Sequence, residues 1–201
     1  MRRISKLEAA QRQIDAAIRM LFNEDDILAV HTLAWAAYCI VTDVAKATNS
    51  GPGPAGVVFR QLLGGYHREI ANFLKHADRD PNDALFEFPE DTPEVLLEIA
   101  FIVYEFIGGK RTREMYALRQ VLDVKRYRYR GDDERRERAR EEERRLERQL
   151  EDADTDEERE EVYRQRERDA RSTQKAYMTF GRKILANEDL FAPREDGRYR
   201  L

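Results

Sequence analysis

A stretch dominated by arginine and glutamate, between Asp132 and Arg171, restricts the possible fold more than any other feature of this chain. Both residue types favour the helical conformation, and oppositely charged side chains four residues apart stabilise it further. The stretch has too few apolar side chains to form a core of its own. Its apolar residues form only a sparse seam, made of Ala139, Leu146, Leu150, Ala153, Val162 and Ala170. We therefore expect long charged helices that project from a folded domain.

The middle of this stretch contains a turn signal. After Asp-Ala-Asp, Thr155 is followed three residues later by Glu158, which is the spacing of a capping box. The helix that begins there becomes apolar only near Tyr177–Leu185, where we expect it to return to the domain. The sequence thus predicts an antiparallel helical hairpin over residues 131–187, followed by a loosely held, flexible tail over residues 188–201.

Residues 1–130 carry the apolar side chains needed for a core, and their spacing is that of helices. Capping residues, glycines and prolines divide this region into five helical segments, with predicted caps at Ser5, within residues 23–26 and at Thr112. The expected helices span residues 5–22, 27–47, 57–77, 92–107 and 112–124. The third contains the pair Gly64–Gly65, which either kinks it or divides it in two. We predict an all-α fold, a five-helix-type bundle core from which the hairpin protrudes.

The balance of charge argues against one class of function. The chain has 36 Lys+Arg and 40 Asp+Glu, a formal net charge of −4, which does not suit nucleic-acid binding driven by bulk charge. No apolar stretch predicts a membrane span, and the chain does not begin with a signal-peptide pattern. The lone Cys39 cannot form an intrachain disulfide and should be a small buried side chain. We expect a soluble cytoplasmic protein.

Residues 72–80, Asn-Phe-Leu-Lys-His-Ala-Asp-Arg-Asp, concentrate ionisable side chains beside an apolar helix. Pro81 should end that helix, so that the last of these residues form an exposed turn. Cations and an imidazole in such a place suit an anionic ligand. The candidate ligand-binding residues are Asn72, Lys75, His76, Asp78, Arg79 and Asp80, with His31 from the central helix. The alternatives are cations that complement a helix dipole, and a core histidine hydrogen-bonded to a neighbour.

Residues 125–130, Lys-Arg-Tyr-Arg-Tyr-Arg, form a second basic segment in which cations alternate with aromatic rings. Such a run can hold phosphates while its rings stack on bases. The candidate nucleic-acid contacts are Lys125, Arg126, Arg128 and Arg130. The alternative is a positively charged helix end whose tyrosines pack on the domain.

A helical core with an arginine followed at short range by a histidine, here Arg60 and His67, resembles the HEPN superfamily of toxin–antitoxin and antiviral systems. Residues 31–34, His-Thr-Leu-Ala, and residues 72–80 also resemble a group of small uncharacterised bacterial helical proteins. Many HEPN proteins are metal-independent ribonucleases whose arginine and histidine meet across a homodimer. The resemblance implies catalysis by Arg60 and His67, although Gln61 departs from the usual residue after the arginine.

The chemistry implied by this resemblance needs no cofactor. Cleavage by the RNA 2′-hydroxyl needs a base and a cation near the phosphorus, and His67 and Arg60 are suited to these roles. A neighbouring Arg60 would also lower the pKa of His67 and favour its neutral form.

Two other hypotheses compete with RNA cleavage. In the first, a metal ion is bound by His31, His67, His76, Asp78 and Asp80. None of these residues has the His-x-x-x-His spacing that is typical of metal ligands on a helix. In the second, the bundle is a non-catalytic dimerisation or docking module whose hairpin recruits a protein. The expected partners are a second copy in a homodimer, RNA, and a protein at the hairpin, with no membrane.

Overall fold

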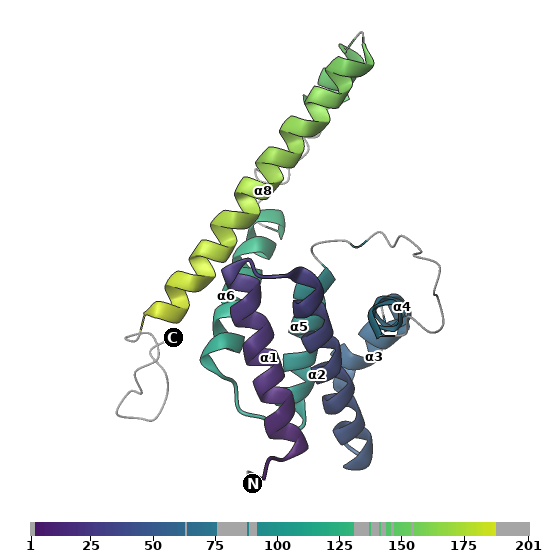
Figure 1. The fold of residues 1–201 in the computed structure, drawn as a ribbon, viewed down its shortest axis with the longest axis vertical. Helices are drawn as coiled ribbons and strands as arrows, with labels where there is room; N and C mark the ends of the chain where they lie inside the picture. The colour runs from purple at the N-terminus through teal and green to yellow at the C-terminus, as the bar shows by residue number, and fades with distance from the viewer. Residues whose placement is uncertain are drawn as a thin grey trace.

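The computed structural model describes residues 3–62, 64–75, 88, 92–130, 137, 141, 144–145, 147–153 and 155–187. All regular structure within these residues is helical, which confirms the predicted all-α class (Figure 1). The helices are α1 (Lys6–Asn23), α2 (Ile27–Ala47), α3 (Gly53–Leu62), α4 (Gly64–Lys75), α5 (Thr92–Phe106), α6 (Arg113–Arg130) and α8 (Asp156–Ala186).

Local capping explains the connection between α1 and α2. The Ser5 Oγ atom accepts a hydrogen bond from the Glu8 amide at 3.0 Å, as the sequence predicts. Glu24 ends α1 in the left-handed conformation, with φ 60°. The Asp26 carboxylate then accepts from the amides two and three residues later, at 2.9 and 3.0 Å. The chain therefore reverses within a few residues, and α2 packs against α1.

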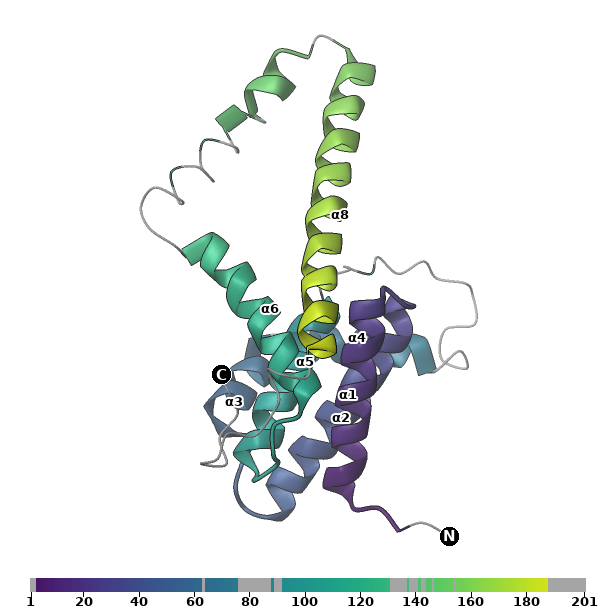
Figure 2. The same cartoon turned by 90° about the vertical axis from the view of Figure 1, so that its left-hand side faces the viewer.

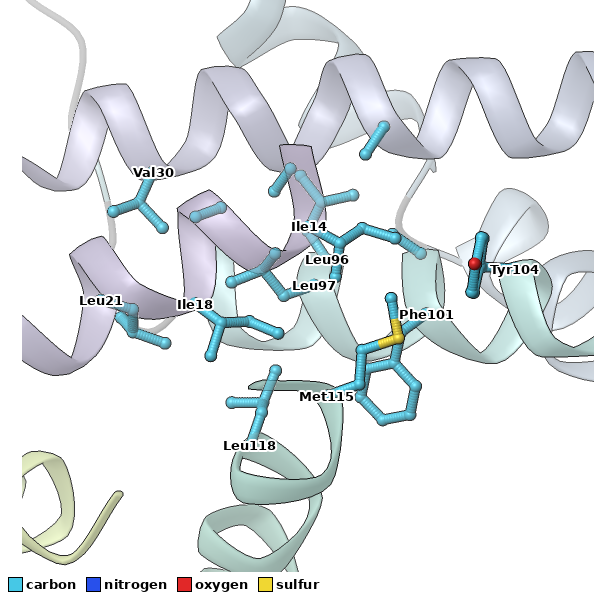
Figure 3. Packing of buried hydrophobic residues seen from close by; sticks show 14 of the residues in the cluster. Ile14, Ile18, Leu21, Val30, Leu96, Leu97, Phe101, Tyr104, Met115 and Leu118 are labelled. Carbon is cyan, nitrogen blue, oxygen red and sulfur yellow. The ribbon is translucent and has the colours of Figure 1, made fainter. Parts of the chain in front are cut away.

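The hydrophobic core lies where α1, α2, α5 and α6 meet (Figure 3). Apolar side chains from facing helices interdigitate there and are removed from water. The largest of them include Ile14, Ile18, Phe22, Leu96, Leu97, Phe101, Met115 and Leu118. This single core joins α1 and α2 to α5 and α6, which follow α3 and α4 in the chain, so the bundle is held by contacts between distant segments.

Helix α2 occupies the middle of the bundle. By length and composition alone it could cross a bilayer, which the sequence analysis did not anticipate, and the core helix of a soluble protein passes the same test. Its Val30, Ala34, Ala37 and Val41 side chains are completely buried. Since α2 packs against α1 on one side and α5 on another, its apolar composition fits its central place in the bundle.

The Gly64–Gly65 pair divides the third expected helix into α3 and α4, one of the two predicted outcomes. Helix α3 packs on α5, and α4 packs on α2. The approach of α3 is close, because a Cβ atom on Gly53 would lie 3.0 Å from the Phe106 ring and one on Gly56 would lie 3.0 Å from Val103. Figure 1 shows α3 and α4 on the side of the bundle away from α8.

Helix α6 begins as predicted, with the Met115 amide donating to the Thr112 Oγ atom at 3.2 Å. It ends at Arg130, six residues beyond the predicted end at residue 124. The physical reason lies on α5, where buried carboxylates accept hydrogen bonds from Lys125 and Arg126. These ion pairs stabilise turns of α6 that the local sequence left uncertain.

Helix α8 has 31 residues and two different halves. The predicted capping box is confirmed at its start, because the Glu158 amide donates to Thr155 and the Thr155 amide donates to Glu158, at 3.2 and 3.1 Å. Its C-terminal half packs on α1 and α6, with Met178 buried. Its N-terminal half projects beyond the bundle, where the second arm of the hairpin was predicted (Figures 1 and 2). Much of the first arm, and the predicted tail over residues 188–201, lie outside the described residues.

Candidate functional site

The fold brings His31 of α2 and His67 of α4 together, although 36 positions separate them in the sequence. The His31 Nε2 and His67 Nδ1 atoms are 3.3 Å apart. The ring centroids are 5.6 Å apart and the ring planes differ by 13°, so the rings lie edge to edge with these two nitrogens between them. His31 is 0% exposed and His67 is 2% exposed. This confirms the interpretation of His31 as a core histidine hydrogen-bonded to a neighbour.

The hydrogen bonding of the pair favours one arrangement of protons. One ring nitrogen must donate and the other accept, so a single proton lies between them. The other nitrogen of His31, Nδ1, is buried and has no hydrogen-bond partner. A buried N–H group without a partner is rarer than a buried acceptor without one. We therefore infer that His31 carries its proton on Nε2 and donates it to His67.

Aromatic rings surround this histidine pair. The Phe59 ring of α3 and the Tyr66 ring of α4 lie 5.0 and 6.0 Å from His67, measured between centroids. Phe88 meets His31 edge-on at 5.6 Å. The pair therefore lies in an apolar environment, where a charged imidazole is poorly solvated.

The pKa values of both histidines reflect this environment. Burial lowers the pKa of His31 from 6.5 to about 4, and the charges of His67 and Lys75 contribute in the same direction. Burial also lowers the pKa of His67 from 6.5 to about 4. The charge of Arg60 was predicted to lower the pKa of His67, and this prediction of the cause was wrong, because burial lowers it. At neutral pH both imidazoles are uncharged and can accept or donate hydrogen bonds.

Arg60, the predicted catalytic partner of His67, lies on the exposed surface of α3. Its guanidinium acts on Tyr38, since burial raises the pKa of that phenol and a hydrogen bond from Arg60 opposes the rise. Among the described residues, no contact joins Arg60 to His67. A single copy of the chain thus does not assemble the predicted catalytic pair, and a meeting of the two residues across a homodimer stays a prediction.

The predicted anion-binding residues are only partly visible. Asn72 and Lys75 are exposed at the end of α4, while His76, Asp78, Arg79 and Asp80 lie outside the described residues. The charge of Lys75 reaches the histidine pocket, because it lowers the pKa of His31. Burial raises the pKa of the Cys39 thiol, and the charge of Lys75 opposes that shift as well. Lys75 therefore places a positive potential beside the histidine pair.

The alternative metal site draws no support from the part of the chain that the structure describes. No three histidine, cysteine or acidic residues are grouped there as metal ligands. His31 and His67 are two nitrogen ligands without a carboxylate or a thiolate beside them. Three of the five proposed ligands lie outside the described residues, so the hypothesis as a whole stays a prediction.

Lys125, a predicted nucleic-acid contact, belongs to a polar cluster around a buried acid that we call the Glu94 clamp, made of Glu94, Lys125 and Gln174. The Lys125 Nζ atom lies 2.7 and 2.6 Å from the Glu94 carboxylate oxygens and 2.9 Å from the Gln174 Oε1 atom. The Gln174 Nε2 atom donates to Glu94 at 2.7 Å. The clamp joins α5, α6 and α8 through groups that satisfy one another.

A second buried acid supports the same region. Glu98, one turn after Glu94 on α5, accepts hydrogen bonds from Arg126 and, at 3.3 Å, from Arg119. Two of the four predicted nucleic-acid contacts, Lys125 and Arg126, are therefore paired with buried acids of α5. Arg128 and Arg130 belong to the last turn of α6, and their side chains lie outside the described residues.

Two more arginines fasten the C-terminal half of α8. Arg182 donates to the Phe22 carbonyl at the end of α1, at 2.5 Å. Arg113, at the start of α6, donates to the Leu185 carbonyl. Because carbonyls at helix ends lack partners within their own helix, these bonds satisfy groups that would otherwise depend on water.

The roles of Glu94, Glu98 and Gln174 in joining α5 to α6 and α8 were not predicted from the sequence. A usable signal was present, since Glu94 and Glu98 are acids four residues apart in the first half of a largely apolar helix. An acid on a buried helix face needs a cationic partner from another element. Which cation that would be, and from which helix, required the folded structure.

Comparisons of the chain with models of protein families, with curated proteins and with solved structures find no match.

Proposed function

We propose that this chain is a non-catalytic docking module, in which the bundle holds the hairpin as a charged arm for a protein partner. The observation that carries this proposal is the Glu94 clamp. It fixes the base of α8 to α5 and α6 through the buried Glu94 and two half-buried side chains that satisfy one another. A long helix that is fixed at one end and has exposed side chains along the other presents the same surface to every partner that approaches it.

The outer half of α8 supports the same proposal. Between Asp156 and Ser172 the described side chains are exposed, apart from the half-buried Val162. The ion pairs there, such as Glu160–Arg164 and Glu167–Arg171, lie within the helix itself. These pairs support the helix without contributing to the core of the bundle, so the length of the arm is not explained by stability.

Affinity capture tests the docking function. The bait is the tagged full-length chain, and the comparison is the same chain with Asp133–Arg171 replaced by a short linker. We expect the full-length bait to enrich a partner that the shortened bait loses. The shortened chain should keep a cooperative thermal transition, because the core residues of the bundle and residues 174–185 are retained. Equal enrichment by both baits would contradict the proposal.

A second candidate function is metal-independent RNA cleavage of the HEPN type in the cytoplasm, with a toxin or antiviral role. The observation that favours it is that His67 is uncharged at pH 7, since burial lowers its pKa to about 4. A pKa this low makes His67 a weak base, and its Nδ1 atom would have to leave the hydrogen bond with His31 before it could take a proton. Its burial weighs against it, since a substrate phosphate would have to enter between α2 and α4.

The substitution His67→Gln tests this second candidate. Glutamine roughly keeps the size and hydrogen bonding of histidine but cannot transfer a proton. EDTA-resistant cleavage of a short RNA should fall by a factor on the order of 10²–10⁴ if His67 is the base. Undiminished cleavage by a folded variant would exclude this role for His67, and absence of cleavage by the wild-type chain would exclude the activity.

A further inference from the structure

The outer half of α8 has an unusual arrangement of charge around Tyr163, which is 55% exposed. Arg159 and Glu160 precede it by four and three residues, and Arg166 and Glu167 follow it by three and four. Positions three and four residues apart lie on the same face of a helix. Tyr163 is thus the centre of an exposed face on which each flank carries one arginine and one glutamate.

We propose that the partner of the arm is a second copy of this chain, whose α8 packs antiparallel to the first about Tyr163; this inference rests on the proposed docking function. Rotation about a twofold axis at Tyr163 places Glu160 against Arg166 of the second copy. It also places Arg159 against Glu167 of the second copy. Symmetry generates both contacts twice, so four pairs of opposite charge surround a contact between the two tyrosine rings.

The same charge pattern opposes a parallel arrangement. In a parallel, in-register pair each arginine and each glutamate of this face would meet its own equivalent, and like charges would repel. The longer-range charge distribution agrees with the antiparallel choice. Residues 156–161 carry five acidic side chains and one basic, whereas residues 164–171 carry four basic and two acidic. Antiparallel packing brings the acidic segment of one copy to the basic segment of the other.

The present contacts of these charges leave them available for a partner. Glu160 pairs with Arg164 at 2.9 Å and Glu167 pairs with Arg171 at 2.6 Å, within turns of the same helix. The side chains of Glu160 and Glu167 are more than half exposed, so their charges stay hydrated and can form a second pair at little cost in desolvation. The resulting dimer should be weak and should dissociate as salt is added.

Charge reversal with rescue tests this arrangement in the full chain. Sedimentation velocity at low ionic strength should detect a reversible dimer in the wild type. Glu160→Arg alone and Arg166→Glu alone each bring like charges together twice, and should weaken dimerisation roughly tenfold or more. The double variant Glu160→Arg/Arg166→Glu restores opposite charges across the axis and should recover most of the association. Glu161→Arg, on the opposite face of α8, is the matched control and should leave the dimer intact.

Cross-linking provides a second measurement that does not depend on these reversals. In a Cys39→Ser background, Tyr163→Cys should form a covalent dimer with a short thiol-specific cross-linker. Asp156→Cys should not, because antiparallel packing about residue 163 separates the two copies of residue 156 by about 20 Å. Cross-linking of Asp156→Cys but not of Tyr163→Cys would overturn the antiparallel arrangement.

Three results would overturn the inference: a wild type that is monomeric at low salt, a folded double variant that does not recover dimerisation, or the reverse cross-linking pattern. Failure here is distinguishable from failure of the docking function. A monomeric wild type whose arm still captures another protein removes the second copy as partner and keeps docking. A monomeric wild type that captures nothing removes both.

Discussion

The two interfaces that attach outlying helices to the core bury polar groups in opposite ways. Where α8 meets α5 and α6, Glu94 and Lys125 are opposite charges in contact, with Gln174 bonded to both. Where α4 meets α2, His31 and His67 share one hydrogen bond and have no counter-charge. At the α8 interface the groups are charged, and each charge is compensated by its partner. At the α4 interface the two imidazoles are buried without a counter-charge, and burial favours their uncharged form.

This difference sets what each interface tolerates. Removing one partner from the Glu94 clamp leaves an uncompensated charge in a place that water cannot easily reach. Adding a proton to the histidine pair creates such a charge where none existed. The attachment of α8 should therefore be sensitive to single substitutions, and the attachment of α4 should be sensitive to acid.

The largest expected effect comes from Lys125→Met. Glu94 is 4% exposed, so loss of the lysine leaves a buried carboxylate without its cation. We expect the free energy of unfolding to fall by about 3–5 kcal/mol, measured by urea denaturation. Hydrogen exchange should also speed up in the C-terminal half of α8, because the clamp holds that segment on the bundle.

The neutral double variant Glu94→Gln/Lys125→Met separates lost charge compensation from lost packing. It removes both charges and should recover most of the stability that the single variant loses. Arg12→Met is the matched surface control, because Arg12 and Glu8 form an exposed ion pair at 2.5 Å. That change should cost less than about 1 kcal/mol. A double variant as unstable as Lys125→Met would show that the ion pair is not the source of the effect.

The second prediction concerns acid and the histidine pair. Both folded-state pKa values, about 4, lie below the ordinary value of 6.5. Between these pH values the unfolded chain binds more protons, so the stabilisation is fully present above pH 6.5 and is lost as the pH falls toward 4. The loss should be on the order of 3 kcal/mol for each imidazole taken alone. Urea denaturation at a series of pH values measures it.

A variant without titratable groups in this pocket is the control. His31→Leu/His67→Leu keeps the site apolar and should lose the part of the pH dependence that lies between 6.5 and 4. The comparison uses the slope of stability against pH, so a change in absolute stability does not obscure it. An unchanged slope in this variant would assign the acid sensitivity to the carboxylates instead.

What could be predicted from the sequence was local. Ser5, Asp26 and Thr155 cap their helices as expected, because a capping side chain and the amide it satisfies are two or three residues apart. The all-α class followed from helical periodicity, and the exposed outer half of α8 followed from the shortage of apolar residues there. Such features depend on neighbours along the chain.

What could not be predicted depends on residues far apart in the sequence. Nothing local indicates that His31 contacts His67, or that Lys125 serves a buried acid 31 residues earlier. The basic run at residues 125–130 therefore suggested a nucleic-acid surface, while the first two cations of the run pair with buried acids of α5. Helix α6 extends past its predicted end for the same reason, since tertiary ion pairs outweigh weak local preference.

The third prediction separates the two interfaces by how closely their helices approach. A Cβ atom on Gly181 of α8 would lie 2.6–2.8 Å from three atoms of the fully buried Phe22 ring. Gly181→Ala should therefore lower the free energy of unfolding by roughly 1–2 kcal/mol, since overpacking outweighs the better helix propensity of alanine. The midpoint of urea denaturation measures the loss.

Gly65→Ala in α4 is the matched substitution at the other interface. Gly65 is exposed and helical, and a Cβ atom built on it meets nothing within 4 Å. Since no steric clash opposes the change, its main effect is that alanine lowers the conformational entropy of the unfolded chain. The free energy of unfolding should therefore rise by up to about 1 kcal/mol. A loss of stability with Gly181→Ala and a gain with Gly65→Ala would show that α8 packs closely against α1, whereas the start of α4 leaves room for a methyl group. A loss of stability with Gly65→Ala would mean that the start of α4 is packed more tightly than these distances indicate.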